Sequence, residues 1–290
     1  MPLKRIVVIA NPRAGKRAAG RFEDALKILA ASVETQCIKT EHQGHAIELA
    51  ARFGSDPDTI VAICGGDGTL NEALNGLPTT GVLGLLPAGT ANVVARELGI
   101  PLDLREAAKS LLSGTVRRLD TGRVNGRRYL MVAGFGYDAY VAGRVPGFTK
   151  ALLGKYAYHL QATLDYPLYK RPQLTIVDDQ GCSYVGEFAL IANMRRYGGD
   201  LFFAHSAVCD DGMLDLVLFR NFSPRSVLRG VWGAFTRRGV PEAVAVRSRS
   251  RSFLLVSDGP VPFEIDGEVC PPLTTARITI EPASLAMMVP

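Results

Sequence analysis

The sequence has few of the features that would place the protein in several common classes. Its five cysteines among 290 residues are odd in number, scattered along the chain and never spaced as CxxC. No disulfide framework or zinc site is therefore indicated, and a reducing cytoplasm is the expected location. No run of about 18 uninterrupted apolar residues occurs, so no segment is expected to span a membrane. The first predicted strand, residues 6–10, is too short and too β-branched for the apolar core of a signal peptide.

Two widespread nucleotide-binding motifs are absent as well. No GxxxxGK[ST] sequence occurs, which excludes a P-loop, and Asn71 stands where a GxGxxG fingerprint would have its third glycine. The net charge of +5 and the pI near 9.0 suit an anionic ligand or an anionic membrane surface, although a solvated basic face is the commoner explanation. Because no recognition motif accompanies the charge, no nucleic-acid partner is expected.

The most informative stretch is residues 59–76, TIVAICGGDGTLNEALNG. A β-branched apolar run over 60–64 predicts a strand buried on both faces, and a helix is expected from about 70 to 74, ended by an Asn-Gly pair. Glycines between strand and helix let the backbone approach a phosphate, at which the free N–H groups of the helix would point. A glycine loop taken alone is more often an ordinary strand-to-helix turn.

Asp67 lies in the middle of this glycine loop. A carboxylate beside a polyphosphate would repel it unless a divalent cation or a transferable proton lies between them. The loop therefore favours chemistry on a metal-bound nucleotide over simple phosphate binding.

The first part of the chain alternates between strand and helix patterns. Strands are predicted at 5–10, 34–40 and 82–86, and helices at 45–53 and 104–112. This alternation predicts an α/β domain with a parallel sheet. Loops after parallel strands form the ligand crevice, so the sequence NPRAGK after the first strand should face the same side as the glycine loop.

From about residue 116 strand patterns dominate, which predicts an α/β domain over 1–120 and a mostly antiparallel β domain over 121–290. An Asn125-Gly126 turn predicts a hairpin between 121–124 and 129–132. Further strands are expected, at 187–192, 213–219, 261–265, 275–280 and 285–289. The last two either complete the β domain or return to the first domain.

Two helical stretches interrupt the second half, at about 150–168 and at 225–238. Both mix basic residues with aromatic and apolar ones, which suits a helix in a membrane interface. An amphipathic helix packed on a sheet is the more common explanation for the same pattern.

Acidic residues accompany turns at two places in the second half. In AVCDDGMLD, residues 207–215, clustered carboxylates could bind a hard cation, whereas an Asp-Gly hairpin explains them without one. Asp266-Gly267 is a strong hairpin signal that does not by itself explain Glu268. Two acids at a rigid turn could supply a general base and an orienting or metal-linked partner, and the sequence leaves open which is which.

Four elements, NPRAGK, GGDGTLNE, PAGTANVVAR and the pair DDGMLD with DGE, together resemble the motifs of the diacylglycerol kinase catalytic-domain family. They occur in the family's order along nearly the whole chain. This family of lipid kinases includes sphingosine kinases and is more distantly related to NAD kinases. The resemblance implies a Rossmann-like α/β domain with a parallel sheet, an antiparallel β-sandwich-like domain, and a nucleotide in the cleft between them. The chain departs from the family at Val93, where many members carry Asp.

The resemblance also implies which residues would bind the nucleotide. ATP phosphates would lie against the glycine loop, with Asp67 acting through Mg²⁺ and Thr90 contacting phosphate or metal. The implied cofactor-binding residues are Asn11, Pro12, Gly15, Lys16, Thr40, Gly65, Gly66, Asp67, Gly68, Thr69, Asn71, Glu72, Gly89, Thr90 and Asn92.

Two further sites follow from the resemblance. A structural Mg²⁺ would be held by the Asp211 carboxylate and the backbone carbonyls of Val208 and Met213. Catalysis would use Asp67 together with Glu268 or Asp266, one of which would act as the base.

We therefore expect an ATP-dependent kinase that transfers the γ-phosphoryl group to a hydroxyl of diacylglycerol or a related lipid. Contact with the inner face of the membrane is expected, and a homodimer is left open. The alternatives are a kinase of a soluble hydroxyl compound such as NAD, and a non-catalytic ATP sensor, against which the retained carboxylates argue. The sequence does not identify the lipid, because apolar pockets carry no readable code.

Overall fold

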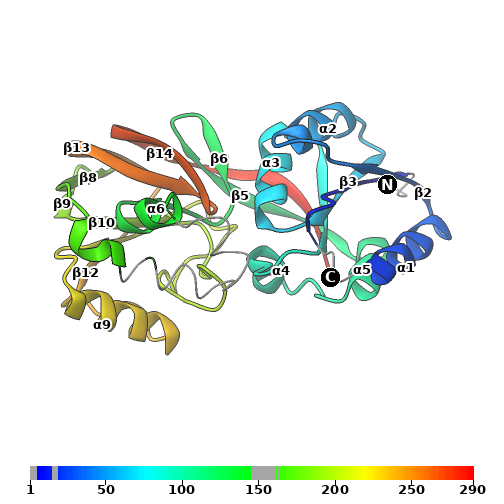
Figure 1. Cartoon of the computed structure of the whole chain (residues 1–290). Coiled ribbons are helices and arrows are strands. Elements are labelled where there is room, and N and C mark those ends of the chain that lie inside the picture. Colours follow the sequence, from blue (N-terminus) through cyan, green and yellow to red (C-terminus); the bar gives the residue numbers. More distant parts are fainter. Residues whose placement is uncertain (1–4, 15–18, 145–160, 162–163) are drawn as a thin grey trace.

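The computed structural model describes residues 5–14, 19–144, 161 and 164–290 (Figure 1). Its first part is a parallel sheet in the order β2-β1-β3-β4, with helices on both of its faces. The strands are β1 (Arg5–Ala10), β2 (Glu34–Lys39), β3 (Thr59–Gly65) and β4 (Val82–Pro87). The helices are α1 (Ala19–Ala30), α2 (His45–Phe53), α3 (Asp67–Gly76), α4 (Val93–Leu98) and α5 (Leu104–Ser113). The predicted α/β domain with a parallel sheet is confirmed.

Strand β3 occupies the middle of this sheet, and all seven of its residues are buried. Helices cover both faces of the sheet, which explains the apolar run that predicted this strand. Helix α3 follows at Asp67, three residues earlier than predicted, so Asp67 and Gly68 belong to its first turn. Its last residue is Gly76, where a Cβ atom would lie 2.0 Å from the carbonyl oxygen of Ile47. This glycine ends the helix as predicted, and it also lets α3 pack closely on α2.

The second part of the chain is mostly antiparallel, as predicted. Its strands are β5 (Thr115–Val124), β6 (Arg127–Tyr129), β7 (Val132–Phe135), β8 (Leu174–Asp178), β9 (Ser183–Gly186), β10 (Phe188–Ala192), β11 (Leu214–Phe219), β12 (Ala245–Ser250), β13 (Ser252–Ile265) and β14 (Glu268–Val289). Its described helices are α6 (Tyr137–Ala142), the 3₁₀-helix η2 (Tyr166–Leu168) and α9 (Pro224–Phe235). The helix predicted at 150–168 lies mostly outside the described residues.

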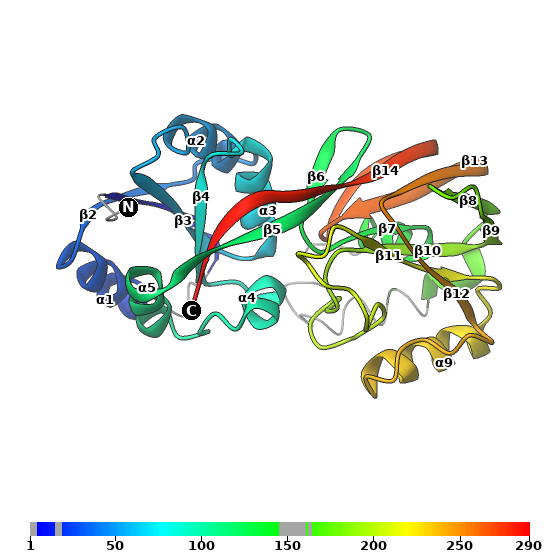
Figure 2. The same ribbon diagram turned by 180° about the vertical axis from the view of Figure 1, so that it is seen from behind.

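Strands β5 and β14 run from one domain into the other, as Figure 2 shows. Residues 285–289 of β14 pair with residues 115–119 of β5, and Ala286 and Met287 also pair in parallel with β4. The two predicted closing strands are therefore one long strand with an irregularity between Glu281 and Leu285, and its end returns to the first domain. The boundary predicted after residue 120 falls inside β5, because the strand continues through it.

Asn125 and Gly126 form the predicted hairpin turn between β5 and β6, with φ angles of 46° and 97°. Both central residues of such a two-residue turn have positive φ, which suits Asn-Gly. Behind these strands lie two apolar cores. One extends from the parallel sheet into the second domain, and the other fills the interior of the antiparallel strands. No described helix is long and apolar enough to cross a bilayer.

Candidate active site

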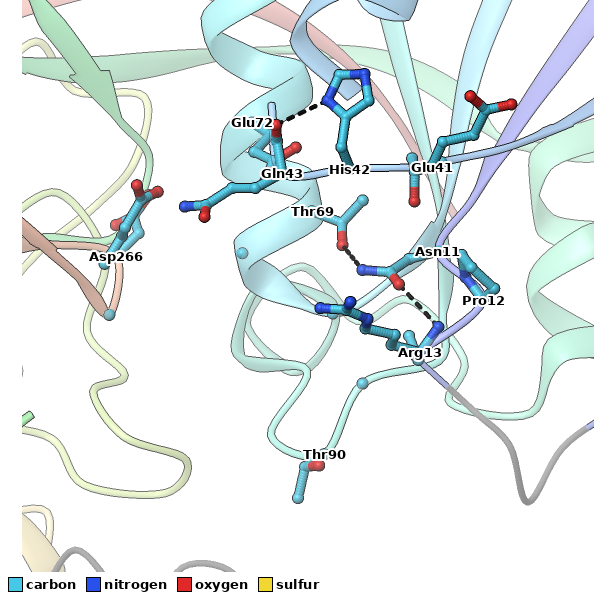
Figure 3. Close-up of a pocket in the computed structure, with 17 residues that line it drawn as sticks. Asn11, Pro12, Arg13, Glu41, His42, Gln43, Thr69, Glu72, Thr90 and Asp266 are labelled. Carbon is cyan, nitrogen blue, oxygen red and sulfur yellow. Dashed lines mark hydrogen bonds between the residues drawn. The ribbon is translucent and has the colours of Figure 1, made fainter. Parts of the chain in front are cut away.

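A cleft of about 620 Å³ opens where the two domains meet (Figure 3). Loops after β1, β2, β3 and β4 form one wall, and the turn between β13 and β14 forms the other. The lining residues are Asn11, Pro12, Arg13, Ala14, Thr40, Glu41, His42, Gln43, Gly66, Gly68, Thr69, Glu72, Gly89, Thr90, Asp266, Gly267 and Glu268. The structure thus brings together eleven of the residues named from the sequence, at the carboxyl ends of the parallel strands.

The loop after β1 is tied to the first turn of α3. The side-chain amide of Asn11 donates to Thr69 Oγ1 at 2.9 Å, and Asn11 Oδ1 accepts the backbone N–H of Arg13 at 2.9 Å. Asn11 therefore fixes both its own loop and a hydroxyl beside the glycine loop. The neighbouring residues Gly15 and Lys16, predicted to bind the nucleotide, lie outside the described residues.

The loops after β3 and β4 touch through two glycines. A Cβ atom at Gly89 would lie 2.5 Å from the Cα atom of Gly66, so a side chain there would force the loops apart. Asn92 closes the second loop from within, since its amide exchanges hydrogen bonds of 2.9 and 3.0 Å with the backbone of Gly89. Thr90 is exposed at the rim of the cleft and does not cap a helix, because Asn92 occupies the N-cap position of α4.

Helix α3 points its N-terminus towards this part of the cleft. The N–H of Leu70 bonds to the carbonyl of Gly66, so in the described structure the preceding amides of Asp67, Gly68 and Thr69 are the free donors of the helix end. A Cβ atom at Gly68 would meet nothing within 4 Å, and Gly68 lines the cleft. Free amides, the positive end of a helix dipole and open space together form a site for an anion.

Asp67 caps a second helix. Its two carboxylate oxygens accept the backbone N–H groups of Val93 and Val94 at 3.1 and 3.2 Å, which are the first residues of α4. The half-buried carboxylate thus links the loop after β3 to the helix after β4. Asp67 does not line the cleft directly, and neither do Gly65, Asn71 and Asn92.

Asp266 is buried, and both of its oxygens are occupied. Oδ1 accepts the backbone N–H groups of Met131 and Val132 at 2.9 and 3.0 Å. Oδ2 accepts the backbone N–H of Leu130 and the side-chain amide of Asn71, both at 2.8 Å. Burial raises the pKa of the Asp266 carboxyl, while its hydrogen bonds act in the opposite direction. With four donors directed at it, this carboxylate holds the turn and connects it to α3.

Glu268 is the more accessible acid of the turn. Its side chain is about one third exposed and forms an ion pair with Arg127 of β6. It lines the main cleft and also an adjoining cavity of about 510 Å³ that Asn71, Glu72 and Arg127 border. An accessible carboxylate beside a cationic partner can exchange a proton with a bound hydroxyl, and a fully bonded buried carboxylate cannot do so as readily.

Two further buried acids support this turn from behind. Glu264 accepts the backbone N–H of Gly267, and Asp138 accepts the hydroxyl of Tyr197 at 2.6 Å. Burial raises the pKa of Asp138 to about 6, and burial together with the nearby Asp138 raises the pKa of Glu264 well above its ordinary value. Neither acid was expected from the sequence, in which Glu264 appears only as one residue of the strand predicted at 261–265.

Asn75 and Arg128 join α3 to the second domain and were missed as functional residues. The Asn75 side chain accepts the Arg128 N–H at 2.9 Å and donates to the Arg128 carbonyl at 3.0 Å. The buried Arg128 guanidinium donates to the carbonyls of Leu74 and Leu77 at the end of α3. A cationic side chain on the last carbonyls of a helix stabilises its C-terminus. The sequence showed Asn75 only as a helix stop.

The three residues predicted to hold a structural Mg²⁺ lie on the loop before β11, away from the cleft. Asp211 accepts the backbone N–H of Met213 at 3.0 Å and forms an ion pair with Arg249, while Val208 is 44% exposed. The Arg249 guanidinium already balances the carboxylate, so the residues present do not require a metal there. This Mg²⁺ site stays a prediction.

Two family models cover almost the whole chain. Residues 5–124 match the diacylglycerol kinase catalytic domain, and residues 131–289 match the YegS C-terminal NAD kinase β-sandwich-like domain. A diacylglycerol kinase of Bacillus subtilis is 28% identical over 277 residues, covering 92% of this chain and 90% of that protein. A diacylglycerol kinase of Staphylococcus saprophyticus is 31% identical over 221 residues, covering 74% of this chain and 72% of that protein.

The fold also matches solved structures. The crystal structure of a diacylglycerol kinase from Bacillus anthracis superposes with a TM-score of 0.77 at 22% identity, covering 100% of this chain and 98% of that one. At this identity the superposition concerns the fold, and the family models with the more similar sequences carry the assignment. The chain belongs to the diacylglycerol kinase family and is, as a member of it, a lipid kinase.

Proposed function

We propose that this protein transfers the γ-phosphoryl group of ATP to the hydroxyl group of diacylglycerol or a closely related lipid. The observation that carries the proposal is the pairing across one cleft of a helix N-terminus with free amides and an accessible carboxylate, Glu268. Phosphoryl transfer depends mainly on positioning and charge stabilisation, which these two walls could provide. The names of the relatives supply the substrate class.

On this proposal the two walls have separate roles. The amides of Asp67, Gly68 and Thr69 would bind phosphate oxygens, while Asn11 would keep Thr69 oriented towards them. Glu268 would take the proton of the lipid hydroxyl, and Arg127 would hold that carboxylate in place. Asp266, with four donors directed at it, would position the turn and not act as the base.

The carboxylate of Asp67, just behind the first wall, also fits a magnesium ion brought in with ATP. Asp67 is a half-buried carboxylate next to the helix N-terminus, and no described basic side chain forms an ion pair with it. A hard divalent cation prefers such oxygen ligands. When bound, Mg²⁺ would neutralise charge on the phosphates, and Asp67 with the α3 amides would hold the complex against the glycine loops.

The test uses purified protein, labelled ATP, Mg²⁺ and mixed micelles that contain diacylglycerol, a sphingoid base or another long-chain alcohol, with NAD and sugars offered in parallel. We expect label in diacylglycerol or a related lipid. The variant Glu268→Gln should lose at least about 100-fold in turnover, the usual scale for a general base. Asp67→Ala should also lose transfer while the protein stays folded.

The matched control is Glu281→Gln. Glu281 is a similarly exposed carboxylate, paired with Arg123 of β5 at 2.8 Å and more distantly with Arg128 at 3.8 Å, and it does not line the cleft. It should keep nearly full activity. Label that moves only into NAD or a sugar would refute the lipid substrate, ATP binding without any turnover would favour a sensor, and normal turnover by Glu268→Gln would refute the assigned base.

A further inference from the structure

Helix α9 carries its large apolar side chains on the outside of the molecule. Leu228, Val231, Trp232 and Phe235 are 70, 40, 65 and 67% exposed. Their spacing of three, one and three residues places them along one stripe of the helix. In Figure 1 the helix lies at the edge of the second domain, below β12 and apart from the first domain.

Small residues form the buried face of the same helix. Gly230, Gly233 and Ala234 are buried against the domain. A Cβ atom at Gly230 would lie 2.6 Å from the ring of Phe219, and one at Gly233 would lie 2.2 Å from the carbonyl oxygen of Gly239. The helix backbone thus rests directly on the domain, so the orientation that exposes the apolar stripe is fixed by close packing.

Unpaired arginines lie on one side of the apolar stripe and at its C-terminal end. Arg225 and Arg229 on the helix, and Arg237 and Arg238 just after it, are exposed and form no ion pair within the described part of the chain. Arg195 and Arg196 nearby are different, since both pair with Glu97.

A cavity of about 580 Å³ continues this basic surface from the end of α9 to the first domain. Three arginines line it, Arg96, Arg196 and Arg237, together with Asp200 and Phe235. Arg237 is held over the ring of Phe202, with its guanidinium carbon 4.9 Å from the ring centroid. Arg196 is paired with Glu97 and Asp200, so Arg96 and Arg237 supply the unpaired positive charge at the base of the apolar stripe within the described residues.

We propose that α9 is a membrane-docking surface that binds anionic bilayers, with the stripe Leu228, Val231, Trp232 and Phe235 entering the interface and the arginines contacting lipid headgroups. An amphipathic helix with aromatic and leucine side chains on one face and arginines around them has this behaviour. A second copy of the chain suits the surface less well, because a two-fold contact would bring its unpaired arginines towards those of the partner. The inference rests on the proposed function for its purpose, since a lipid kinase must reach its substrate.

Trp232 provides a direct readout, because it is the single tryptophan of the chain. The full-length protein would be mixed with vesicles of phosphatidylglycerol and phosphatidylcholine, without ATP or diacylglycerol. Emission should shift to shorter wavelength and be quenched by lipids brominated on their acyl chains. Vesicles of pure phosphatidylcholine should bind at least about tenfold more weakly, because each basic residue near an anionic surface contributes about fivefold. High salt should remove most of this difference.

Two variants test the two parts of the surface while keeping the reporter. Leu228→Ser/Phe235→Ser should weaken vesicle binding about tenfold or more and abolish quenching. Arg229→Gln/Arg237→Gln should weaken binding to anionic vesicles only. The controls, Val185→Ser/Leu254→Ser on strands β9 and β13 and Arg52→Gln/Arg251→Gln, replace exposed residues of the same kind elsewhere and should bind as the unchanged protein does.

The outcomes separate this inference from the proposed function. Unchanged vesicle binding by Leu228→Ser/Phe235→Ser, or no spectral shift of Trp232, would overturn it. A dimer in ultracentrifugation that this variant disrupts, without vesicle binding, would assign the surface to a second copy instead. Phosphorylation of a short-chain, water-dispersed diacylglycerol does not need the surface, so the variant should keep that activity. If the unchanged protein does not phosphorylate the short-chain diacylglycerol, the proposed function is refuted, while the result on membrane docking still stands.

Discussion

Asp266→Asn is the substitution that tests most directly whether this carboxylate holds the structure together. Asp266 has a φ angle of 50°, which Asn tolerates almost as well as Asp, so the change adds little backbone strain. Asn keeps the volume but replaces one oxygen by an NH₂ group. Whichever oxygen is replaced, the NH₂ group then faces two N–H donors that lose their acceptor.

The structure sets the size of the effect. Four donors converge on the carboxylate within 3.0 Å, two on each oxygen. A buried donor left without a partner costs about 1–3 kcal/mol, so two of them give a loss of roughly 2–6 kcal/mol in the free energy of unfolding. Relief of the cost of burying a charge offsets part of this loss. The expected net loss of about 2–4 kcal/mol is a large share of the total stability of a typical domain, about 5–15 kcal/mol.

Urea unfolding measures this loss, and Glu268→Gln is the comparison. The Asp266→Asn midpoint should fall clearly with an unchanged slope. Glu268 forms a partly exposed ion pair, so its variant should change stability by less than about 1 kcal/mol while losing turnover. An Asp266→Asn protein as stable as the original, or a Glu268→Gln protein as unstable as Asp266→Asn, would refute the division of roles within the turn.

Two other predictions concern buried groups. Burial raises the pKa of Asp138 from 3.8 to about 6. Between these pH values the folded protein holds a proton that the unfolded chain has lost. The free energy of unfolding therefore falls as pH rises through this window. Asp138→Asn should therefore gain stability relative to the original protein as pH rises from about 4 to 6. Urea unfolding would contradict this if the difference in free energy of unfolding between the two proteins were the same at both pH values. Gly122→Ala would place a Cβ atom 2.0 Å from the Tyr129 ring and should cost about 1–3 kcal/mol. Gly259→Ala, with open space around it, is the control and should be nearly neutral.

The first domain could be predicted because its local patterns agree with its final structure. Strand β3 is apolar throughout and lies inside a sheet covered on both faces, so its sequence had one plausible interpretation. The glycine loop after it was located correctly for the same reason. Helix α3 began earlier than predicted, since the helix pattern ignores Asp67 and Gly68. Asp67 is held at the start of the helix by its hydrogen bonds to the backbone of α4.

The chemistry of the site was less predictable, because the partners of each side chain are far away in sequence. Asp67 bonds to residues 26 and 27 positions later, and Asp266 accepts from Asn71, 195 positions earlier. The sequence could show two acids in one turn but not that one is saturated and the other accessible. The missed pair Asn75 and Arg128 has the same cause, since only the fold brings β6 onto the end of α3.

Helix α9 shows where a periodic pattern stops being informative. The spacing of Leu228, Val231, Trp232 and Phe235 predicts one apolar stripe, and the usual inference is that such a stripe faces the core. Gly230 and Gly233 carry the missing information, because a helix that packs through glycines brings its backbone, and not its large side chains, against the domain. A stripe of small residues opposite a stripe of large ones therefore leaves two orientations to choose between. Here the close contacts at the glycines decide it, and the large residues lie on the outside of the molecule.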